Sequence, residues 1–132
     1  HELQLRISVE IEPNLLVHTD DVLLDQILFN LISNATKYSP KGGLVKIAAF
    51  NKNGRVEVRI SDNGPGIPVE EIDKIFEKFY RIQNDQLYRA KGHGLGLYLS
   101  KYFATLLHAE IAVESFVGSG STFCLILPET RR

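Results

Sequence analysis

The chain carries most of its strand patterns in two pairs, and a glycine-containing turn joins each pair. Alternating apolar residues at 43–50 and 55–61 flank Lys-Asn-Gly at 52–54, and apolar runs at 109–115 and 121–128 flank the turn FVGSGS. Such pairs form antiparallel hairpins. The remaining periodic segments are a strand pattern at 3–11 and helical patterns at 22–39, 69–76 and about 95–107. Because strands and helices do not alternate strictly, this order predicts an α+β sandwich with helices on one face of a mixed sheet.

Composition narrows the class of protein. The 132 residues suffice for one domain with a real core, and a net charge of −1 provides no basic field for nucleic acid. No apolar run approaches the roughly 18 residues that span a bilayer. Cys124 is the single cysteine, so no internal disulfide forms and a reduced, cytoplasmic setting is expected. Because the chain lacks Met and starts at His1, we expect it to be part of a longer protein.

The predicted helix at 22–39 carries an unusual polar stripe. At 100° per residue, Asn30, Asn34, Lys37 and Gln26 share one side. The neighbouring arc is apolar and predicts core packing through Leu24, Ile27, Leu28, Leu31, Ile32 and Ala35. A solvated face is the ordinary explanation of such a stripe, but Asn costs roughly half a kcal/mol against Ala in a helix. Amide oxygens followed by a lysine suit a hard cation and a phosphate better.

Asp62 ends a predicted strand and is followed by Asn-Gly-Pro-Gly. Turn formation alone explains Asp-Asn-Gly well. The functional alternative is a carboxylate that accepts a hydrogen bond from the 6-amino group of adenine, where guanine would present a carbonyl oxygen instead. In that alternative Gly64 and Gly66 let the flat base approach the backbone.

Residues 91–101, KGHGLGLYLSK, place three glycines directly before a helical pattern. Such a segment presents a row of N–H groups and a positive helix end to an anion. The segment matches neither the Walker phosphate loop nor the dinucleotide fingerprint, and protein-kinase signatures are absent from the sequence.

Taken in order, these motifs resemble the catalytic ATP-binding domain of bacterial sensor histidine kinases, in the superfamily shared with gyrase, heat-shock chaperone ATPases and MutL. NLISNATKYSP (30–40) is similar to the N box, DNGPGIP (62–68) to the first glycine box and IFEKFYR (75–81) to the F box. GHGLGLYLSK (92–101) and GSGSTF (118–123) are similar to the second and third glycine boxes. The resemblance covers residues 1–132 as one domain. It implies a two-layer Bergerat-type sandwich of a mixed five-stranded sheet and three helices, with an ATP lid at about 77–93.

The resemblance also implies residue roles toward ATP and Mg²⁺. Asn34 would hold Mg²⁺ with Asn30 beside it, Lys37 would contact phosphate, and Arg81 would reach the γ-phosphate, so Asn34, Lys37 and Arg81 are the catalytic candidates. Asp62 would accept from the adenine amino group, and Ser121 or Thr122 would close the adenine side through water. The other implied nucleotide contacts are Tyr38, Gly64, Gly66, Ile67, Tyr80, Gly92, His93, Gly94, Leu95, Gly96 and Leu97.

One departure within the superfamily bears on the reaction. Its ATP-hydrolysing members carry a glutamate at the position of Asn30, and an amide cannot take a proton from water. The resemblance therefore implies phosphoryl transfer to a histidine that lies on a separate helical dimerisation domain. His1 is a poor acceptor candidate because it opens a strand pattern and no Pro follows as the acceptor motif needs.

The partners expected from the resemblance are this dimerisation domain and a downstream response regulator. The chain alone should be monomeric and nearly inactive, and its parent should be a homodimer that can be an inner-membrane receptor. Two alternatives stay open: a nucleotide-binding regulatory module of the pseudokinase kind, and a slow ATPase of the same superfamily.

Overall fold

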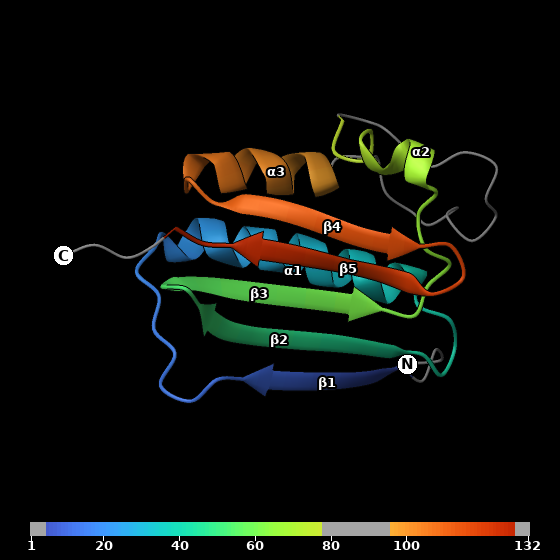
Figure 1. The fold of residues 1–132 in the computed structure, drawn as a ribbon, viewed down its shortest axis with the longest axis horizontal. Coiled ribbons are helices and arrows are strands. Elements are labelled where there is room, and N and C mark those ends of the chain that lie inside the picture. The colour runs from blue at the N-terminus through green and yellow to red at the C-terminus, as the bar shows by residue number, and fades with distance from the viewer. Residues whose placement is uncertain (1–4, 78–95, 129–132) are drawn as a thin grey trace.

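A computed structural model describes residues 5–77 and 96–128. The sheet has the strand order β1-β2-β3-β5-β4; β1 and β2 are parallel and the other neighbours are antiparallel. Its strands are β1 (Arg6–Ile11), β2 (Leu44–Lys52), β3 (Arg55–Asp62), β4 (Glu110–Phe116) and β5 (Gly120–Ile126). The helices are α1 (Asp21–Tyr38), α2 (Val69–Ile72) and α3 (Gly96–Leu106). Figure 1 shows this arrangement, which confirms the predicted α+β fold with a mixed five-stranded sheet and three helices.

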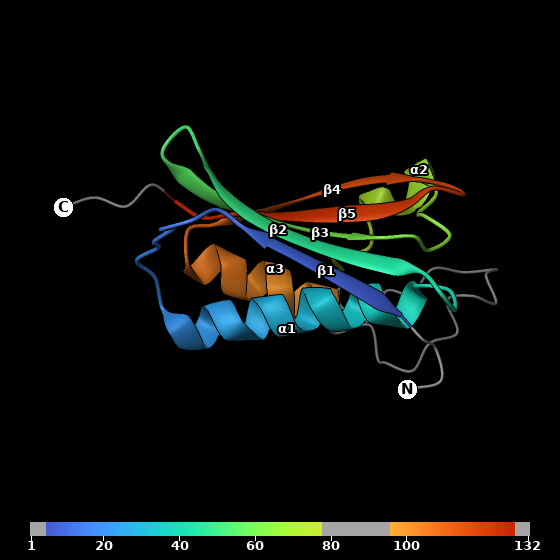
Figure 2. The ribbon, with the colours of Figure 1, turned by 90° about the horizontal axis from the view of Figure 1, so that it is seen from below.

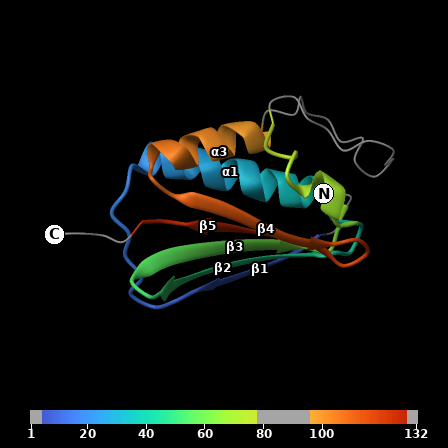
Figure 3. The same ribbon diagram turned by 45° about the horizontal axis from the view of Figure 1, so that its top comes forward.

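The molecule has two layers. Helices α1 and α3 lie side by side on one face of the sheet, as Figures 2 and 3 show, and α2 lies beside the end of β4. The core between the layers is apolar and includes Ile27, Leu31, Val45, Ile60, Phe123 and Leu125. Neither α1 nor α3 covers the opposite face of the sheet (Figure 2). None of the described helices is long and apolar enough to cross a membrane.

Helix α1 begins and packs as its sequence predicts. The side chain of Asp20 accepts a hydrogen bond from the backbone N–H of Leu23 at 3.0 Å, which caps the helix. The apolar arc faces the core, where Ile27, Leu31 and Ala35 are almost fully buried. The polar stripe with Asn30, Asn34 and Lys37 therefore lies next to the core and is partly exposed or exposed.

The second helix is shorter than predicted. The pattern predicted helix over 69–76, but α2 ends at Ile72 and turns follow. The backbone N–H groups of Glu71, Lys74 and Glu77 each bond the carbonyl three residues earlier, at 2.9 Å. Such tight i→i−3 bonds replace the α-helical pattern at this point. The other element boundaries lie within three residues of the prediction.

The segments that carry the sequence motifs meet at one end of the sheet. In Figures 1 and 3 the end of β3, the C-terminal end of α1, the start of α3 and the β4–β5 turn all lie at this end. Helix α3 contacts α1 and runs antiparallel to it, which brings the start of α3 beside the N-box part of α1. The fold thus gathers at one place motifs that lie far apart in the sequence.

Candidate functional site

Asp62 is a buried carboxylate at the end of β3. Only 8% of its surface is exposed, and its Oδ1 accepts a hydrogen bond from the backbone N–H of Gly64 at 2.8 Å. Burial raises the pKa of Asp62 above its usual value, and the backbone N–H groups of Gly64 and Ser121 partly offset that rise. Burial makes the charged form of this carboxylate costly. Its two oxygens can still accept more hydrogen bonds than these two backbone N–H groups donate.

The loop that follows Asp62 is fixed at both of its sides. Asn63 accepts a hydrogen bond from the backbone N–H of Leu44 at 2.8 Å, which ties the loop to the start of β2. On the other side, the carbonyl oxygen of Pro65 accepts from the N–H of Gly118 in the β4–β5 turn at 2.8 Å. The first and third glycine boxes therefore form one connected surface, as expected for a preformed binding site.

Two glycines in this surface are required by the fold itself. Gly66 has a φ of +81°, and a Cβ placed on it would collide with the backbone carbonyl of Phe116. Gly120 has a φ of +95°, and a Cβ there would collide with the carbonyl of Asp62. The prediction that Gly66 lets a flat base approach the backbone stays a prediction. The structure adds a separate reason for this glycine, which is the close passage of the β4–β5 turn.

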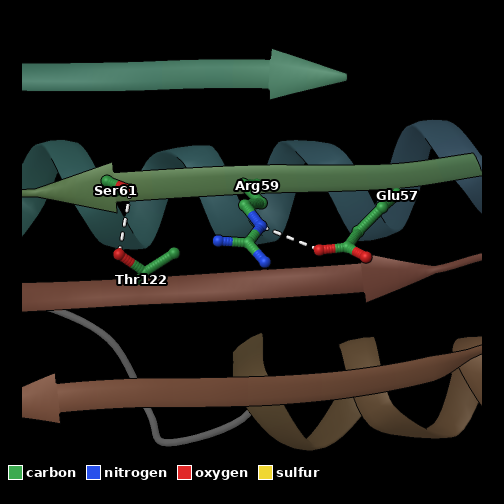
Figure 4. Close-up of polar contacts among 4 residues, drawn as sticks. All are labelled: Glu57, Arg59, Ser61 and Thr122. Atoms are coloured by element: carbon green, nitrogen blue, oxygen red, sulfur yellow. Dashed lines mark hydrogen bonds and ion pairs between the residues drawn. The ribbon is translucent and has the colours of Figure 1, made fainter. Parts of the chain in front are cut away.

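Ser121 and Thr122 lie on opposite faces of the sheet. Ser121 pairs in register with Asp62, so the two side chains share the face toward the helices. Thr122 pairs with Ser61, and their hydroxyls lie 2.9 Å apart on the outer face, as Figure 4 shows. Of the two residues proposed to close the adenine side, only Ser121 therefore shares the face of Asp62.

The N-box residues extend along the last turns of α1. Asn30 and Asn34 are half-buried on the side next to the core, and Lys37 is exposed in the last turn. Neither amide side chain has a hydrogen-bond partner within 5–77 and 96–128. Tyr38 ends the helix, and its side chain is outside what the structure describes.

The F box is anchored at its start. Ile75 is buried in the core, and the ring of Phe76 packs edge-on against Phe123 with centroids 6.3 Å apart. The Nζ atom of Lys101 on α3 lies 5.5 Å from the centre of the Phe76 ring. Most of the predicted lid, with the site residues Tyr80, Arg81, Gly92 and His93, lies outside the described residues, and so do Gly94 and Leu95.

Helix α3 begins within the second glycine box, at Gly96. Gly96 is its first residue and is exposed, and its carbonyl accepts a hydrogen bond from the Ser100 hydroxyl at 2.9 Å. Leu97 is partly buried against the core. Ile67, predicted to wall the base, is buried at 6% exposure within the first glycine box.

Two further residues, Asn63 and Ser115, shape this site and were not predicted from the sequence. Asn63 anchors the loop as described above, and Ser115 on β4 contacts both the loop and β5. A signal for Ser115 exists, because it continues the inward-facing alternation of Ile111 and Val113 with a polar residue. The contacts of Ser115 follow from the register in which β4 pairs with β5, and a single sequence does not reveal that register.

Comparison with known proteins agrees with this geometry. The family described as histidine kinase-, DNA gyrase B-, and HSP90-like ATPase matches residues 19–131. The chain belongs to this family of ATP-binding domains. All the motif residues discussed above fall within the matched range.

Curated relatives in the family are named as sensor kinases. The adaptive-response sensory kinase SasA of Synechococcus sp. (strain JA-3-3Ab) is 38% identical over 130 residues, which are 97% of this chain and 34% of that protein. The sensor-like histidine kinase SenX3 of Mycobacterium tuberculosis is 38% identical over 124 residues, covering 94% of this chain and 30% of SenX3. The chain thus spans about a third of the length of these relatives.

Solved structures show the same fold. The catalytic domain of histidine kinase ThkA superposes with a TM-score of 0.83 at 27% identity, over 98% of this chain and 83% of that one. A mycobacterial sensor histidine kinase, MprB, gives 0.81 at 28% identity, over 96% and 83% of the two chains. Full-length ShkA, solved with AMPPNP, gives 0.83 at 30% identity, over 97% of this chain and 26% of ShkA.

Proposed function

We propose that this chain is the catalytic domain of a two-component sensor histidine kinase. In this proposal it binds Mg-ATP at the end of the sheet where its motifs meet. It then delivers the γ-phosphate to a histidine on a helical dimerisation domain of its parent protein. A response regulator would take the phosphoryl group next.

The observation that carries the proposal is the environment of Asp62. A carboxylate buried to 8% exposure without a cationic partner among the described residues is costly, because burial disfavours its charge. A ligand that donates a hydrogen bond there offsets this cost. The amino group of adenine is such a donor, and buried Ile67 and the glycine loop border the position.

The N-box residues fit the phosphate and metal part of this ligand. Mg²⁺ keeps several waters and commonly takes few protein oxygens besides those of the phosphates. The amide oxygens of Asn34 and Asn30 provide such ligands, and Lys37 provides a point charge for phosphate. Bound Mg²⁺ supplies charge stabilisation for the transferred phosphoryl group, and the protein positions the reactants.

Transfer rather than hydrolysis follows from Asn30. Its amide occupies the helix position one turn before Asn34, and it cannot act as a base toward water. A histidine acceptor brings its own lone pair to the γ-phosphate and needs no such base. The reacting atoms must approach to roughly 3–3.5 Å in line, which docking of the acceptor domain would provide. The proposed parent is a homodimer through that domain.

The test combines the chain with its parent's dimerisation domain, supplied as a separate chain with Mg-ATP. We expect acid-labile, base-stable phosphorylation of that domain, and ATP hydrolysis near background by the chain alone. The Asn34→Ala variant should abolish transfer. Nucleotide binding without transfer would favour the regulatory module, and hydrolysis as fast as transfer would favour the slow ATPase. Asn30→Glu should raise hydrolysis at the expense of transfer.

A further inference from the structure

Ser115, near the end of β4, joins three segments around the adenine side of the site. Its Oγ lies 2.7 Å from the backbone nitrogen of Ile67, 3.1 Å from the carbonyl oxygen of Gly120 and 2.7 Å from Oγ of Ser121. Ile67 belongs to the loop after Asp62, and the other two partners begin β5. One hydroxyl thus connects the first glycine box, β4 and the third glycine box.

The hydrogen-bonding capacity of a hydroxyl fixes the direction of these contacts. A serine hydroxyl donates one hydrogen bond and accepts two. Ser115 accepts from the N–H of Ile67 and donates to the carbonyl of Gly120. In the arrangement that satisfies all three contacts, its remaining capacity is one lone pair, so Ser121 is the donor in the 2.7 Å contact between the two hydroxyls. The proton of Ser121 is therefore directed at Ser115, and its oxygen can only accept from other groups.

We propose that Ser115 is a positioning residue that sets the base specificity of the nucleotide site. It holds the backbone of Ile67 in place and makes Ser121 an acceptor on the face shared with Asp62. Two acceptors that face the base directly match the amino group of adenine and oppose the carbonyl of guanine. The inference rests on the proposed function, because it assumes that the base lies beside Asp62.

A second hydroxyl pair in the same hairpin provides the matched control. Ser61 and Thr122 lie 2.9 Å apart, one ladder position from Asp62 and Ser121, but on the outer face. Loss of the Ser61 hydroxyl removes a contact of the same kind from the same two strands. It leaves the direction of the Ser121 hydroxyl unchanged.

The experiment measures the affinities of ATP and GTP by calorimetry for wild type, Ser115→Val, Ser115→Thr and Ser61→Ala. Valine and threonine have nearly the same shape, so the first two variants differ in the hydroxyl alone. Ser115→Val should weaken ATP by roughly five- to tenfold, as expected for the loss of one or two hydrogen bonds. It should weaken GTP less, because a released Ser121 hydroxyl can donate to guanine. Ser115→Thr and Ser61→Ala should stay within about twofold of wild type.

The outcomes separate this inference from the proposed function. If wild type binds ATP and Ser115→Val keeps both its ATP affinity and its ATP-to-GTP ratio, Ser115 has no positioning role. An equal loss for ATP and GTP would make Ser115 merely structural and would also overturn the inference. If wild type binds no ATP, the proposed function itself fails. Where Ser115→Val does not fold, Ser115→Ala serves in the same comparison, and faster amide exchange at Ile67 provides an independent readout.

Discussion

Strand β3 carries two buried carboxylates on opposite faces of the sheet, and they are satisfied in different ways. Glu57, at 7% exposure, accepts a hydrogen bond from Nε of Arg59 at 2.7 Å on the outer face (Figure 4). Asp62, at 8% exposure on the inner face, receives backbone N–H groups, and burial raises its pKa. The two acids are therefore buried to a similar extent but have different hydrogen-bond partners. Glu57 is paired with a cation of its own strand, whereas Asp62 has only backbone donors among the described residues, and we propose that it accepts a hydrogen bond from the nucleotide.

The largest expected difference between the two acids is in nucleotide binding. Asp62→Asn replaces an acceptor oxygen with an amide that can present a donor to the adenine amino group. We expect ATP to bind about 2–3 kcal/mol more weakly, as for the loss of a charged hydrogen bond. Glu57→Gln, on the other face, should leave ATP affinity within about twofold. Calorimetry with Mg-ATP compares the two variants, and an unchanged affinity in Asp62→Asn would remove that residue from the site.

The second difference is in stability. Arg59→Ala leaves the Glu57 carboxylate buried without its partner, so we expect a loss of about 1–3 kcal/mol in the free energy of unfolding. The side chain of Arg59 is 40% exposed, so solvent screens the pair and the loss should be below that of a fully buried pair. ATP affinity should not change.

The control for this stability measurement is Arg55→Ala, an exposed arginine on the same strand. It should change the free energy of unfolding by less than about 0.5 kcal/mol. Urea denaturation measures both variants. Equal effects at Arg55 and Arg59 would show that Glu57 does not depend on its partner.

The comparison of the two acids also shows what a single sequence can reveal. Alternation and turn chemistry were enough to predict the five strands and the Asn53-Gly54 hairpin, and helical periodicity separated the buried arc of α1 from the stripe with Asn34. The motif order was enough to single out Asp62. These features are local or follow a fixed motif order.

Features that depend on strand register could not be predicted. Ser121 shares the face of Asp62 and Thr122 does not, because β3 pairs with β5 across a gap of about sixty residues in the sequence. Strand register also gives Ser115 its contact with Ile67 and places Glu57 between Phe50 and Ile126 of the neighbouring strands. A shift of the strand pairing by one residue would move each of these side chains to the other face of the sheet.

The pH dependence of folding provides a third difference. The folded-state pKa of Asp62 is raised, so between its usual pKa and the raised value the folded chain holds a proton that the unfolded chain has lost. The contribution of Asp62 to stability therefore falls as the pH rises through this window, and ionised Asp62 destabilises the fold above it. Asp62→Asn removes this dependence.

The measurement for this prediction is urea denaturation of wild type and Asp62→Asn without nucleotide, at several pH values from about 3.5 to 7. The stability of Asp62→Asn relative to wild type should increase with pH. The affinity of wild type for ATP should increase in the same direction, because the ionised carboxylate is the acceptor. A stability difference that is flat or decreases with pH would contradict the raised pKa.

The smallest expected effect comes from replacing the Glu57–Arg59 pair as a whole. Ion pairs with one partner buried and one partly exposed contribute little net stability, and apolar residues of similar volume often replace buried pairs without loss. Phe50 lies beside the pair, with its ring centre 5.8 Å from the guanidinium carbon of Arg59, and offers apolar surface for the new side chains. We therefore expect the double variant Glu57→Leu/Arg59→Met to unfold within about 1 kcal/mol of wild type and to bind ATP as wild type does. If the double variant instead loses as much stability as Arg59→Ala, or loses ATP affinity, the outer-face carboxylate does more than pair with its neighbour, and the division of roles between Glu57 and Asp62 is wrong.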